Sequence, residues 1–233
     1  PLPTGEAIAT PAALLLIERI MRSPGEITLL AVGPLTNLAL AVSVEPRIAQ
    51  AVKEVVIMGG AATVRGNATP VAEANIRNDP EAARIVFHAG WPLTMLGLDV
   101  TTKTLMNSAY LEQIRKAGTP VTDFISAITP FYLNRYRSRL GLDVMHVHDS
   151  SALAYILDPT LFSSQKIYVD VETHGERTSG QTVADFRAQF EQPANVNVCL
   201  EVDSPRFLDM YLEQITSGNL AKVRNLRKVE QLR

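Results

Sequence analysis

Apolar residues along the chain form short continuous runs that alternate with stretches of helical spacing. Runs of β-branched and aliphatic residues at 27–32, 55–60 and 92–100 are typical of strands covered on both faces. Apolar positions at helical spacing predict four helices, at 7–22, 33–42, 45–54 and 78–90. This alternation predicts an α/β fold with an open, mostly parallel central sheet, helices on both faces and a Rossmann-like topology.

The second half of the chain mixes both kinds of pattern. It predicts four helices, at 108–117, 119–137, 150–157 and from Ser204 onward. It also predicts a short strand, HVH, at 146–148, and β-like runs at 166–172, 181–186 and 195–202. The chain has no internal repeat, linker or low-complexity tract, so we expect residues 1–233 to form a single domain.

Composition narrows the class of protein. The 233 residues have a net charge of −2 and no basic block, so neither a nucleic-acid surface nor an anionic-membrane surface is indicated. Cys199 is the single cysteine, which excludes an internal disulfide framework and a cysteine-based zinc site. No apolar run reaches the length of a membrane span, and no signal segment opens the sequence. These features fit a cytoplasmic protein.

Ligands of open parallel sheets gather at the carboxyl ends of the strands. The loops that follow Val32, Met58 and His148 are expected at such ends. The two glycines after Met58 let a ligand or another backbone come close, but GGAATVRG lacks the spacing of a dinucleotide-binding loop.

The segment HVHDSS offers two interpretations. In a strand, His146 and His148 would lie on one face. Asp149 is then placed as the N-cap of the next helix, a role that Ser150 or Ser151 could share. Alternatively, Asp149 ligates a hard cation while His148 transfers a proton near neutral pH.

Amide and carboxylate groups concentrate in the loop before the helix at 78–90. Asn67, Glu73 and Asn75 suit a polyhydroxylated ligand, and Glu73 and Asn75 would point to one side of an extended segment. A polar surface loop is the alternative. For Asn78 and Asp79 we prefer an ordinary helix entry, since Pro80 and Glu81 complete it.

Tyr132 and Tyr136 lie four residues apart, on one face of a predicted helix that also carries three arginines. They could form a half-buried aromatic stripe, or an aromatic wall that stacks on a flat heterocycle.

Six segments in order resemble the inosine-uridine-preferring nucleoside hydrolases: AVGPLTNLALAV, EPRIAQAVKEVVIMGG, GNATPVAEANIRNDPEAARIVF, TMLGLDVT, HDSSALAYILDP and TVADF. The resemblance covers nearly the whole chain. It implies an open α/β sheet, hydrolysis of ribonucleosides to ribose and free base in purine or pyrimidine salvage, and a calcium ion at the strand ends.

The resemblance also assigns roles to residues of this chain. Asp149 matches a calcium-binding aspartate, and the backbone carbonyl of Val32 matches a calcium ligand. His148 matches the proton donor to the leaving base. Further matches are ribose-binding groups at Asn67, Glu73 and Asn75, a pocket wall at Met58, and aromatic positions near the base at Tyr132 and Tyr136. Ala74 stands where the family often has an aromatic residue, which would widen the pocket.

One departure from the family is large. Its aspartate-rich D-x-D-x-x-x-D-D segment, which supplies most calcium carboxylates, is absent from residues 1–233. The chain therefore resembles the carboxyl-terminal two thirds of the family fold. Calcium takes 6–8 oxygens, so we expect Asp149 and one carbonyl to bind it weakly, and this chain alone to be weakly active or inactive.

Three hypotheses for function follow. The first is an N-ribosyl hydrolase acting on a small-molecule ribonucleoside, which the resemblance implies is a homodimer or homotetramer. The second is a non-catalytic nucleoside- or ribose-binding relative that has lost its metal. The third is a structural or oligomer-forming remnant. Stabilisation by ribose or nucleosides would argue against the third hypothesis.

Overall fold

The computed structural model describes residues 8–217, and these divide into two compact units. The first unit contains residues 8–102 and 148–202, and the second contains residues 103–147 and 203–217. Each unit is described by itself. The prediction of a single domain stays a prediction.

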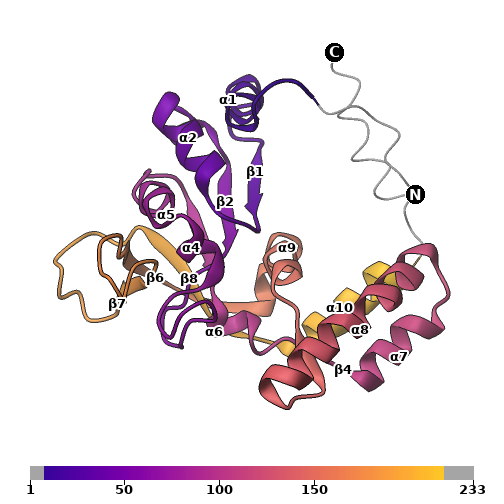
Figure 1. Cartoon of the computed structure of the whole chain (residues 1–233). Helices are drawn as coiled ribbons and strands as arrows, with labels where there is room; N and C mark the ends of the chain where they lie inside the picture. The colour runs from indigo at the N-terminus through magenta and orange to yellow at the C-terminus, as the bar shows by residue number, and fades with distance from the viewer. Residues whose placement is uncertain (1–7, 218–233) are drawn as a thin grey trace. The chain divides into compact units, whose positions relative to one another are not determined.

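The first unit is built on a six-stranded sheet of order β1-β2-β3-β8-β6-β7 (Figure 1). Neighbours are parallel from β1 to β8, whereas β6 runs antiparallel to both β8 and β7. The strands are β1 (Thr28–Ala31), β2 (Glu54–Met58), β3 (Leu93–Leu96), β6 (Phe162–Val171), β7 (Thr182–Asp185) and β8 (Val196–Val202). The predicted open, mostly parallel sheet is therefore confirmed.

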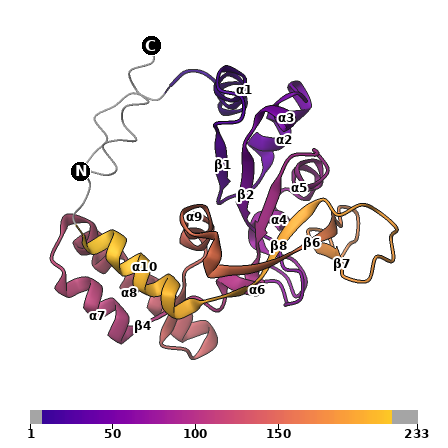
Figure 2. The same ribbon diagram turned by 180° about the vertical axis from the view of Figure 1, so that it is seen from behind.

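Helices cover both faces of this sheet. Figures 1 and 2 show α2 and α5 on one face and α9 on the other, and α9 packs on β2. The helices of this unit are α1 (Ala12–Arg22), α2 (Thr36–Val44), α3 (Ile48–Ala51), α4 (Ala74–Asn78), α5 (Pro80–Phe87), α6 (Leu98–Thr101) and α9 (Asp149–Leu157), with a 3₁₀ turn η1 (Pro159–Leu161).

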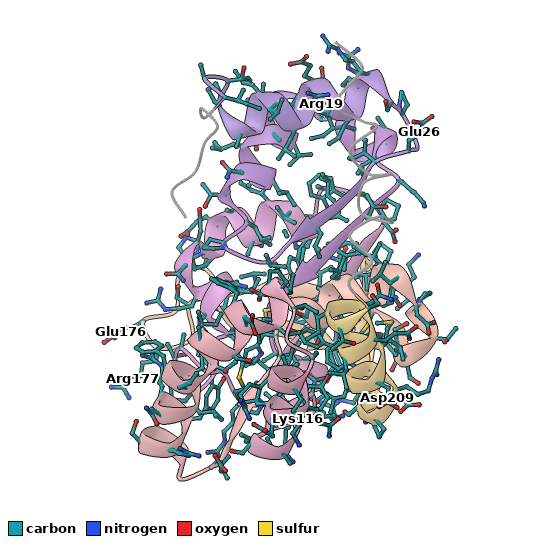
Figure 3. The ribbon with its side chains drawn as sticks, turned by 90° about the vertical axis from the view of Figure 1, so that its right-hand side faces the viewer. Arg19, Glu26, Lys116, Glu176, Arg177 and Asp209 are labelled. Carbon is teal, nitrogen blue, oxygen red and sulfur yellow. The ribbon has the colours of Figure 1, made fainter. Side chains whose placement is uncertain are left out.

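The core of this unit lies between the sheet and the helices. Val55 and Ile57 of β2 and Met95 of β3 are fully buried, as their continuous apolar runs predict. Phe87 and Ile20 fill the space beneath the helices. The side chains are drawn in Figure 3. By contrast β1 is an edge strand of the described sheet, and its Leu30 is 38% exposed.

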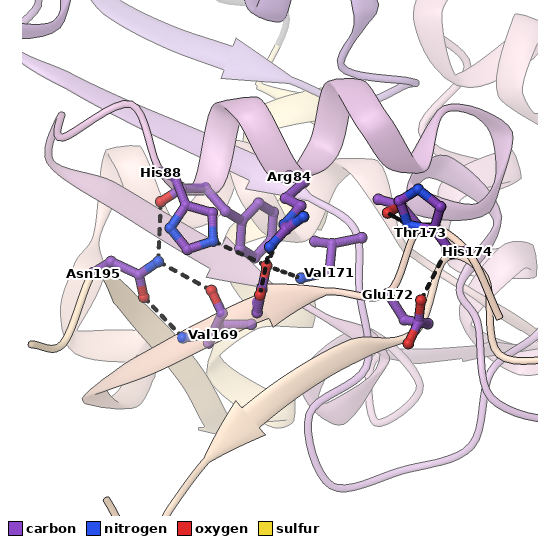
Figure 4. A network of polar contacts seen from close by, with 10 residues as sticks. Arg84, His88, Val169, Val171, Glu172, Thr173, His174 and Asn195 are labelled. Atoms are coloured by element: carbon purple, nitrogen blue, oxygen red, sulfur yellow. Dashed lines mark hydrogen bonds and ion pairs between the residues drawn. The ribbon is translucent and has the colours of Figure 1, made fainter. Parts of the chain in front are cut away.

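Polar contacts attach α5 to the antiparallel end of the sheet (Figure 4). Arg84 and His88 both bind the carboxylate of Asp170 on β6, at 3.0 Å from Nε and 2.9 Å from Nε2. Asn195 donates to the carbonyls of Phe87 and Val169, at 3.0 Å each. These contacts fix the orientation of α5, whose N-terminus follows α4.

The second unit consists of α7 (Ser108–Lys116), α8 (Pro120–Leu140) and α10 (Ser204–Thr216), with β4 (Leu105–Asn107) paired antiparallel to β5 (Val144–His146). Helix α8 packs on both α7 and α10. Tyr110 ties α7 to α10, because its hydroxyl donates to the carbonyl of Leu208 at 2.6 Å. Among the described helices, none combines the length and apolar composition of a bilayer span.

Two predicted strands were wrong in part. The strand predicted at 146–148 instead covers Val144–His146, belongs to the separate β4–β5 pair, and ends before His148. His148 therefore does not follow a strand of the main sheet. The strand predicted at 92–100 ends at Leu96, because Gly97 turns the chain and Leu98 donates to the carbonyl of Gly60 at 2.9 Å, which starts α6.

Candidate functional site

Helix α4 is anchored to the carboxyl end of β2. Met58 is the last residue of β2 and is 2% exposed. Asn75 donates from Nδ2 to the Met58 carbonyl at 2.9 Å, and the same nitrogen lies 3.5 Å from the Met58 sulfur. The side chain of Asn75 is therefore held over the end of the strand.

The carboxylate of Glu73 connects α4 to the glycine turn after β2. Its Oε2 accepts from the backbone N–H groups of Asn75 at 2.9 Å, Gly60 at 3.1 Å and Ile76 at 3.2 Å. Glu73 is the N-cap of α4 and is 2% exposed. Burial raises its pKa, and the backbone N–H groups act in the opposite direction. None of these three bonds uses Oε1.

The expectation that Glu73 and Asn75 lie in one extended segment was wrong. Glu73 has extended backbone angles, but Asn75 lies inside α4, because the Glu73 carboxylate caps the helix there. The two side chains still meet through the Asn75 N–H. Asp79 caps α5 by accepting from Ala82 N at 3.1 Å, as predicted for this helix entry.

Asn67 closes the loop between β2 and α4. Its Oδ1 accepts from Ala74 N at 2.9 Å, and its side chain is exposed. A Cβ at Gly66 would lie 2.3 Å from the Ala72 carbonyl oxygen, so only glycine permits this close loop. Hydrogen bonds join Met58, Glu73 and Asn75, and Asn67 binds the backbone between the last two; we call these four residues the β2-end group.

Asp99, which the sequence did not single out, holds the turn after β2. Its carboxylate accepts from Thr63 N at 2.7 Å, Ala62 N at 2.8 Å and Thr63 Oγ1 at 2.6 Å, and it is 1% exposed. Thr182 on β7 clasps the same turn, with Oγ1 at 2.9 Å from the nitrogen and 2.6 Å from the oxygen of Ala61. The sequence signal for Asp99 was an aspartate inside the apolar run LGLDV. A carboxylate buried in such a run needs several hydrogen-bond donors.

His148 is connected to the end of α6 through Thr101. Its Nδ1 lies 2.9 Å from Thr101 Oγ1, and Thr101 is fully buried at the end of α6. This contact fixes the orientation of the imidazole ring. Thr101 is a second residue that the sequence analysis did not single out.

Asp149 does not cap α9. It is the first residue of the helix, His148 occupies the N-cap position with helical angles, and no side-chain capping bond is present at this end. The prediction of an Asp149 cap was therefore wrong, since His148 already continues the helical backbone. Partial burial raises the pKa of the Asp149 carboxyl. Capping thus gives no reason for an aspartate at this position.

Val32 follows β1 directly, at the end of the sheet where β2 also ends. The register pairs Ala31 with Ile57, so Val32 lies one residue beyond that pair, alongside Met58. Its side chain is 40% exposed. The carboxyl ends of β1 and β2 therefore meet, as predicted for a parallel pair.

Tyr132 and Tyr136 belong to the second unit and are described within it. Tyr132 is 46% exposed on α8 and packs edge-on to Phe131 at 5.8 Å between ring centroids. Tyr136 is half-buried and contacts the ring of His146 at 5.2 Å. The half-buried aromatic stripe therefore describes Tyr136, whereas Tyr132 is open to solvent.

The implied calcium ion was tested against the donor set. Within residues 8–217, no group of three or more His, Cys, Asp or Glu side chains is arranged to hold a metal ion. Asp149 offers one carboxylate and Val32 one carbonyl, whereas calcium takes 6–8 oxygens. The described residues alone do not fit a calcium site.

Comparison with known proteins assigns the family. A family model described as inosine-uridine preferring nucleoside hydrolase matches residues 1–209. The chain belongs to this family. It is 40% identical over 205 residues to the inosine-uridine preferring nucleoside hydrolase of Crithidia fasciculata, covering 88% of this chain. It is 39% identical over 204 residues to a pyrimidine-specific ribonucleoside hydrolase of Escherichia coli O157:H7.

Solved nucleoside hydrolases share the fold. A purine-preferring ribonucleoside hydrolase from Gardnerella vaginalis superposes with a TM-score of 0.88 at 33% identity, covering 94% of this chain and 69% of that one. A plant nucleoside hydrolase gives 0.87 at 32% identity, covering 92% and 70%. The chain spans 65% of the length of the two curated relatives named above. The nucleoside-hydrolase-like fold predicted from the sequence is confirmed.

Proposed function

We propose that the protein hydrolyses the N-glycosidic bond of ribonucleosides, giving ribose and free base. The observation that carries the proposal is the β2-end group, which concentrates amide and carboxylate groups of a nucleoside-hydrolase chain at the end of β2. Several fixed donors and acceptors suit a ribose ring, because each hydroxyl of the sugar needs a hydrogen-bond partner.

Asn67, Glu73 and Asn75 hold the ribose hydroxyls in this proposal, and Met58 lines the same pocket. Cleavage of the bond builds oxocarbenium character on the ribose. Contacts to the hydroxyls that strengthen in the transition state therefore accelerate the reaction. The β2-end group is suited to this because backbone hydrogen bonds already hold Asn67 and Glu73 in place.

His148 transfers a proton to the departing base. The bond between its Nδ1 and Thr101 Oγ1 orients the ring, and we assign the transfer to Nε2. Tyr132 and Tyr136 are proposed to contact the base. Ala74, in place of an aromatic residue, is proposed to widen the pocket.

Calcium is proposed for a complete site, in which Asp149 and the Val32 carbonyl would be two of its ligands. When bound, the ion would lower the pKa of a water molecule. Within residues 8–217, no group of three or more His, Cys, Asp or Glu side chains completes this site.

The test is release of base from inosine and uridine, measured by chromatography for the wild type and for His148→Ala. We expect weak release by the 233-residue chain, and a loss of about 10²–10⁴-fold in the variant. Hydrolysis of a nitrophenyl riboside, whose leaving group needs no proton, should slow far less in the variant. Equal losses for both substrates would contradict the role of His148.

A non-catalytic ribose-binding protein is the second candidate, because the described residues lack a metal-binding group. Calcium titration separates the two. Binding of calcium with turnover supports the hydrolase, whereas ribose binding without metal or turnover supports the binding protein.

The assembly and location of the protein remain predictions. The family resemblance supports a homodimer or homotetramer and a role in purine or pyrimidine salvage, and the single cysteine, Cys199, fits a cytoplasmic location. Sedimentation of the purified chain tests the first of these.

A further inference from the structure

A pocket of about 420 Å³ in the first unit is lined in part by the loop that carries the β2-end group. Thr69, Pro70 and Val71 of that loop form one wall. The opposite wall is the turn between β6 and β7, from Glu176 to Ser179, and Arg77 of α4 lines the pocket as well. Helix α4 thus presents Asn75 to the end of β2 and Arg77 to this pocket.

Two guanidinium groups dominate the charge of the pocket. Arg77 and Arg177 are both exposed, and within the described chain neither forms an ion pair with a carboxylate. Glu176 is the one acidic side chain among the lining residues. Figure 3 labels Glu176 and Arg177, both at the surface. The balance of lining charges is therefore positive.

The wall formed by the loop is rigid. Thr69 Oγ1 accepts from the backbone N–H of Ala72 at 2.9 Å and of Val71 at 3.3 Å. The N–H groups of Ala68 and Thr69 donate to the Ala72 carbonyl at 3.1 and 3.2 Å. The loop is thereby closed on itself before any ligand arrives.

The wall formed by the turn is equally well fixed. Glu172 Oε1 accepts from His174 N at 2.8 Å and Gly175 N at 3.0 Å. Gly180 has φ +87°, and a Cβ there would lie 2.7 Å from the Cα of Arg77. Only glycine allows the turn to lie so close to α4, which sets the spacing between Arg177 and Arg77.

The chemistry of the lining matches a tetrahedral oxyanion. A guanidinium binds phosphate with two parallel hydrogen bonds, and it does so more strongly than neutral donors. Thr178 and Ser179 add hydroxyl groups that can donate to further oxygens. Hydrogen bonds fix the loop and the turn that carry these groups, so binding an anion mainly costs the ordering of the two exposed arginine side chains.

We propose that this pocket binds a phosphoryl group, either as inorganic phosphate or as part of a sugar phosphate. The proposal is independent of the hydrolase function, because it uses none of the residues assigned to that reaction. The pocket shares one loop and helix α4 with the β2-end group, so a ribose phosphate is tested beside the free anion.

The experiment is calorimetric titration of the 233-residue chain in a buffer free of phosphate and sulfate, with inorganic phosphate, ribose and ribose 5-phosphate in separate arms. Arg77→Gln and Arg177→Gln should each weaken phosphate binding by about tenfold or more. Arg19→Gln is the matched control, since Arg19 is exposed on α1 and outside the pocket. Equal melting temperatures would show that all variants fold.

The outcomes separate the sources. Ribose 5-phosphate binding tenfold tighter than both phosphate and ribose identifies a sugar phosphate. Equal affinity for phosphate and ribose 5-phosphate identifies a site for the free anion. Absence of saturable binding by either phosphate compound overturns the proposal, as does unchanged affinity in both pocket variants. Loss of base release alone would not affect it.

Discussion

Glu73 and Asp149 are both carboxylates at the start of a helix, and the pKa of each is raised by burial, but their surroundings differ. Glu73 is 2% exposed and accepts three backbone N–H groups. Asp149 is far more exposed than Glu73, its carboxyl is only partly shielded from water, and it makes no capping bond to α9. The carboxylate of Glu73 therefore stabilises the fold at the end of β2, whereas no capping bond gives the carboxylate of Asp149 that role at the start of α9.

This difference indicates which side of the candidate site is completed by the chain. Around β2, side chains and backbone satisfy one another and leave a fixed set of polar groups. At α9, the Asp149 carboxylate lies in the first turn without a capping bond, and we propose a ligand role for it.

Asp99→Ala should destabilise the protein most, by about 3 kcal/mol or more, because it leaves two backbone N–H groups and the Thr63 hydroxyl without their acceptor in a buried turn. Urea unfolding measures the loss. Asp185→Ala is the control, since Asp185 also accepts backbone N–H groups but is only half-buried. Similar losses in both variants would contradict the importance of burial at Asp99.

Alanine at the two helix starts tests the comparison directly. Glu73→Ala should lower the free energy of unfolding by about 2 kcal/mol, because it removes an N-cap and the acceptor for Gly60 N. Asp149→Ala should change it by less than about 0.5 kcal/mol. Chemical denaturation of both variants measures these free energies of unfolding. A larger decrease for Asp149→Ala than for Glu73→Ala would contradict the comparison.

Thr101→Val should affect activity more than stability. The change removes the hydroxyl that orients His148, so base release from inosine should fall by about tenfold while a nitrophenyl riboside is less affected. Thr102→Val is the matched control, because Thr102 Oγ1 donates to Leu98 O instead. Equal losses in both variants would mean that the contact to His148 is structural only.

The pH dependence of Asp149→Asn gives the smallest effect. The folded pKa of Asp149 lies above its ordinary value of 3.8, so the ionised carboxylate lowers the stability of the wild type above the folded pKa. That cost disappears as the pH falls below 3.8. The variant should therefore be at least as stable as the wild type at pH 7, with the difference shrinking in acid. Thermal melts from pH 3 to 7 measure it, and a wild type stabilised at pH 7 would contradict the sign.

The main sheet was predictable because its strands are continuous apolar runs. Val55 to Met58 are buried on both faces, so their pattern could not be read as a surface helix. The run at 92–100 misled, since the strand ends before Gly97 and helix α6 begins at Leu98 within the same apolar run. The apolar composition of the run does not show where strand β3 ends and helix α6 begins.

The β4–β5 pair was harder to predict because each strand has three residues. So short a strand shows no reliable alternation, and its boundary moved by two residues relative to the HVH pattern. That shift separates His146 from His148 and explains why Asp149 was wrongly expected as a cap.

The candidate site was predictable where side chains cluster in sequence, as in the loop from Asn67 to Asn75. The residues that hold the site in place could not be predicted. Thr101 and Thr182 contact it from positions far away in the sequence. Such contacts depend on the sheet order, which local patterns do not specify.

The most direct test of the account is calorimetric titration of the 233-residue chain with ribose. The β2-end group should bind ribose saturably, and Asn75→Ala should abolish this binding. Asn78→Ala, on the same helix but with its amide bonded to Ala74 O, should bind ribose as the wild type does. Absence of binding by the wild type, or undiminished binding by Asn75→Ala, would contradict the claim that this side of the site holds the sugar.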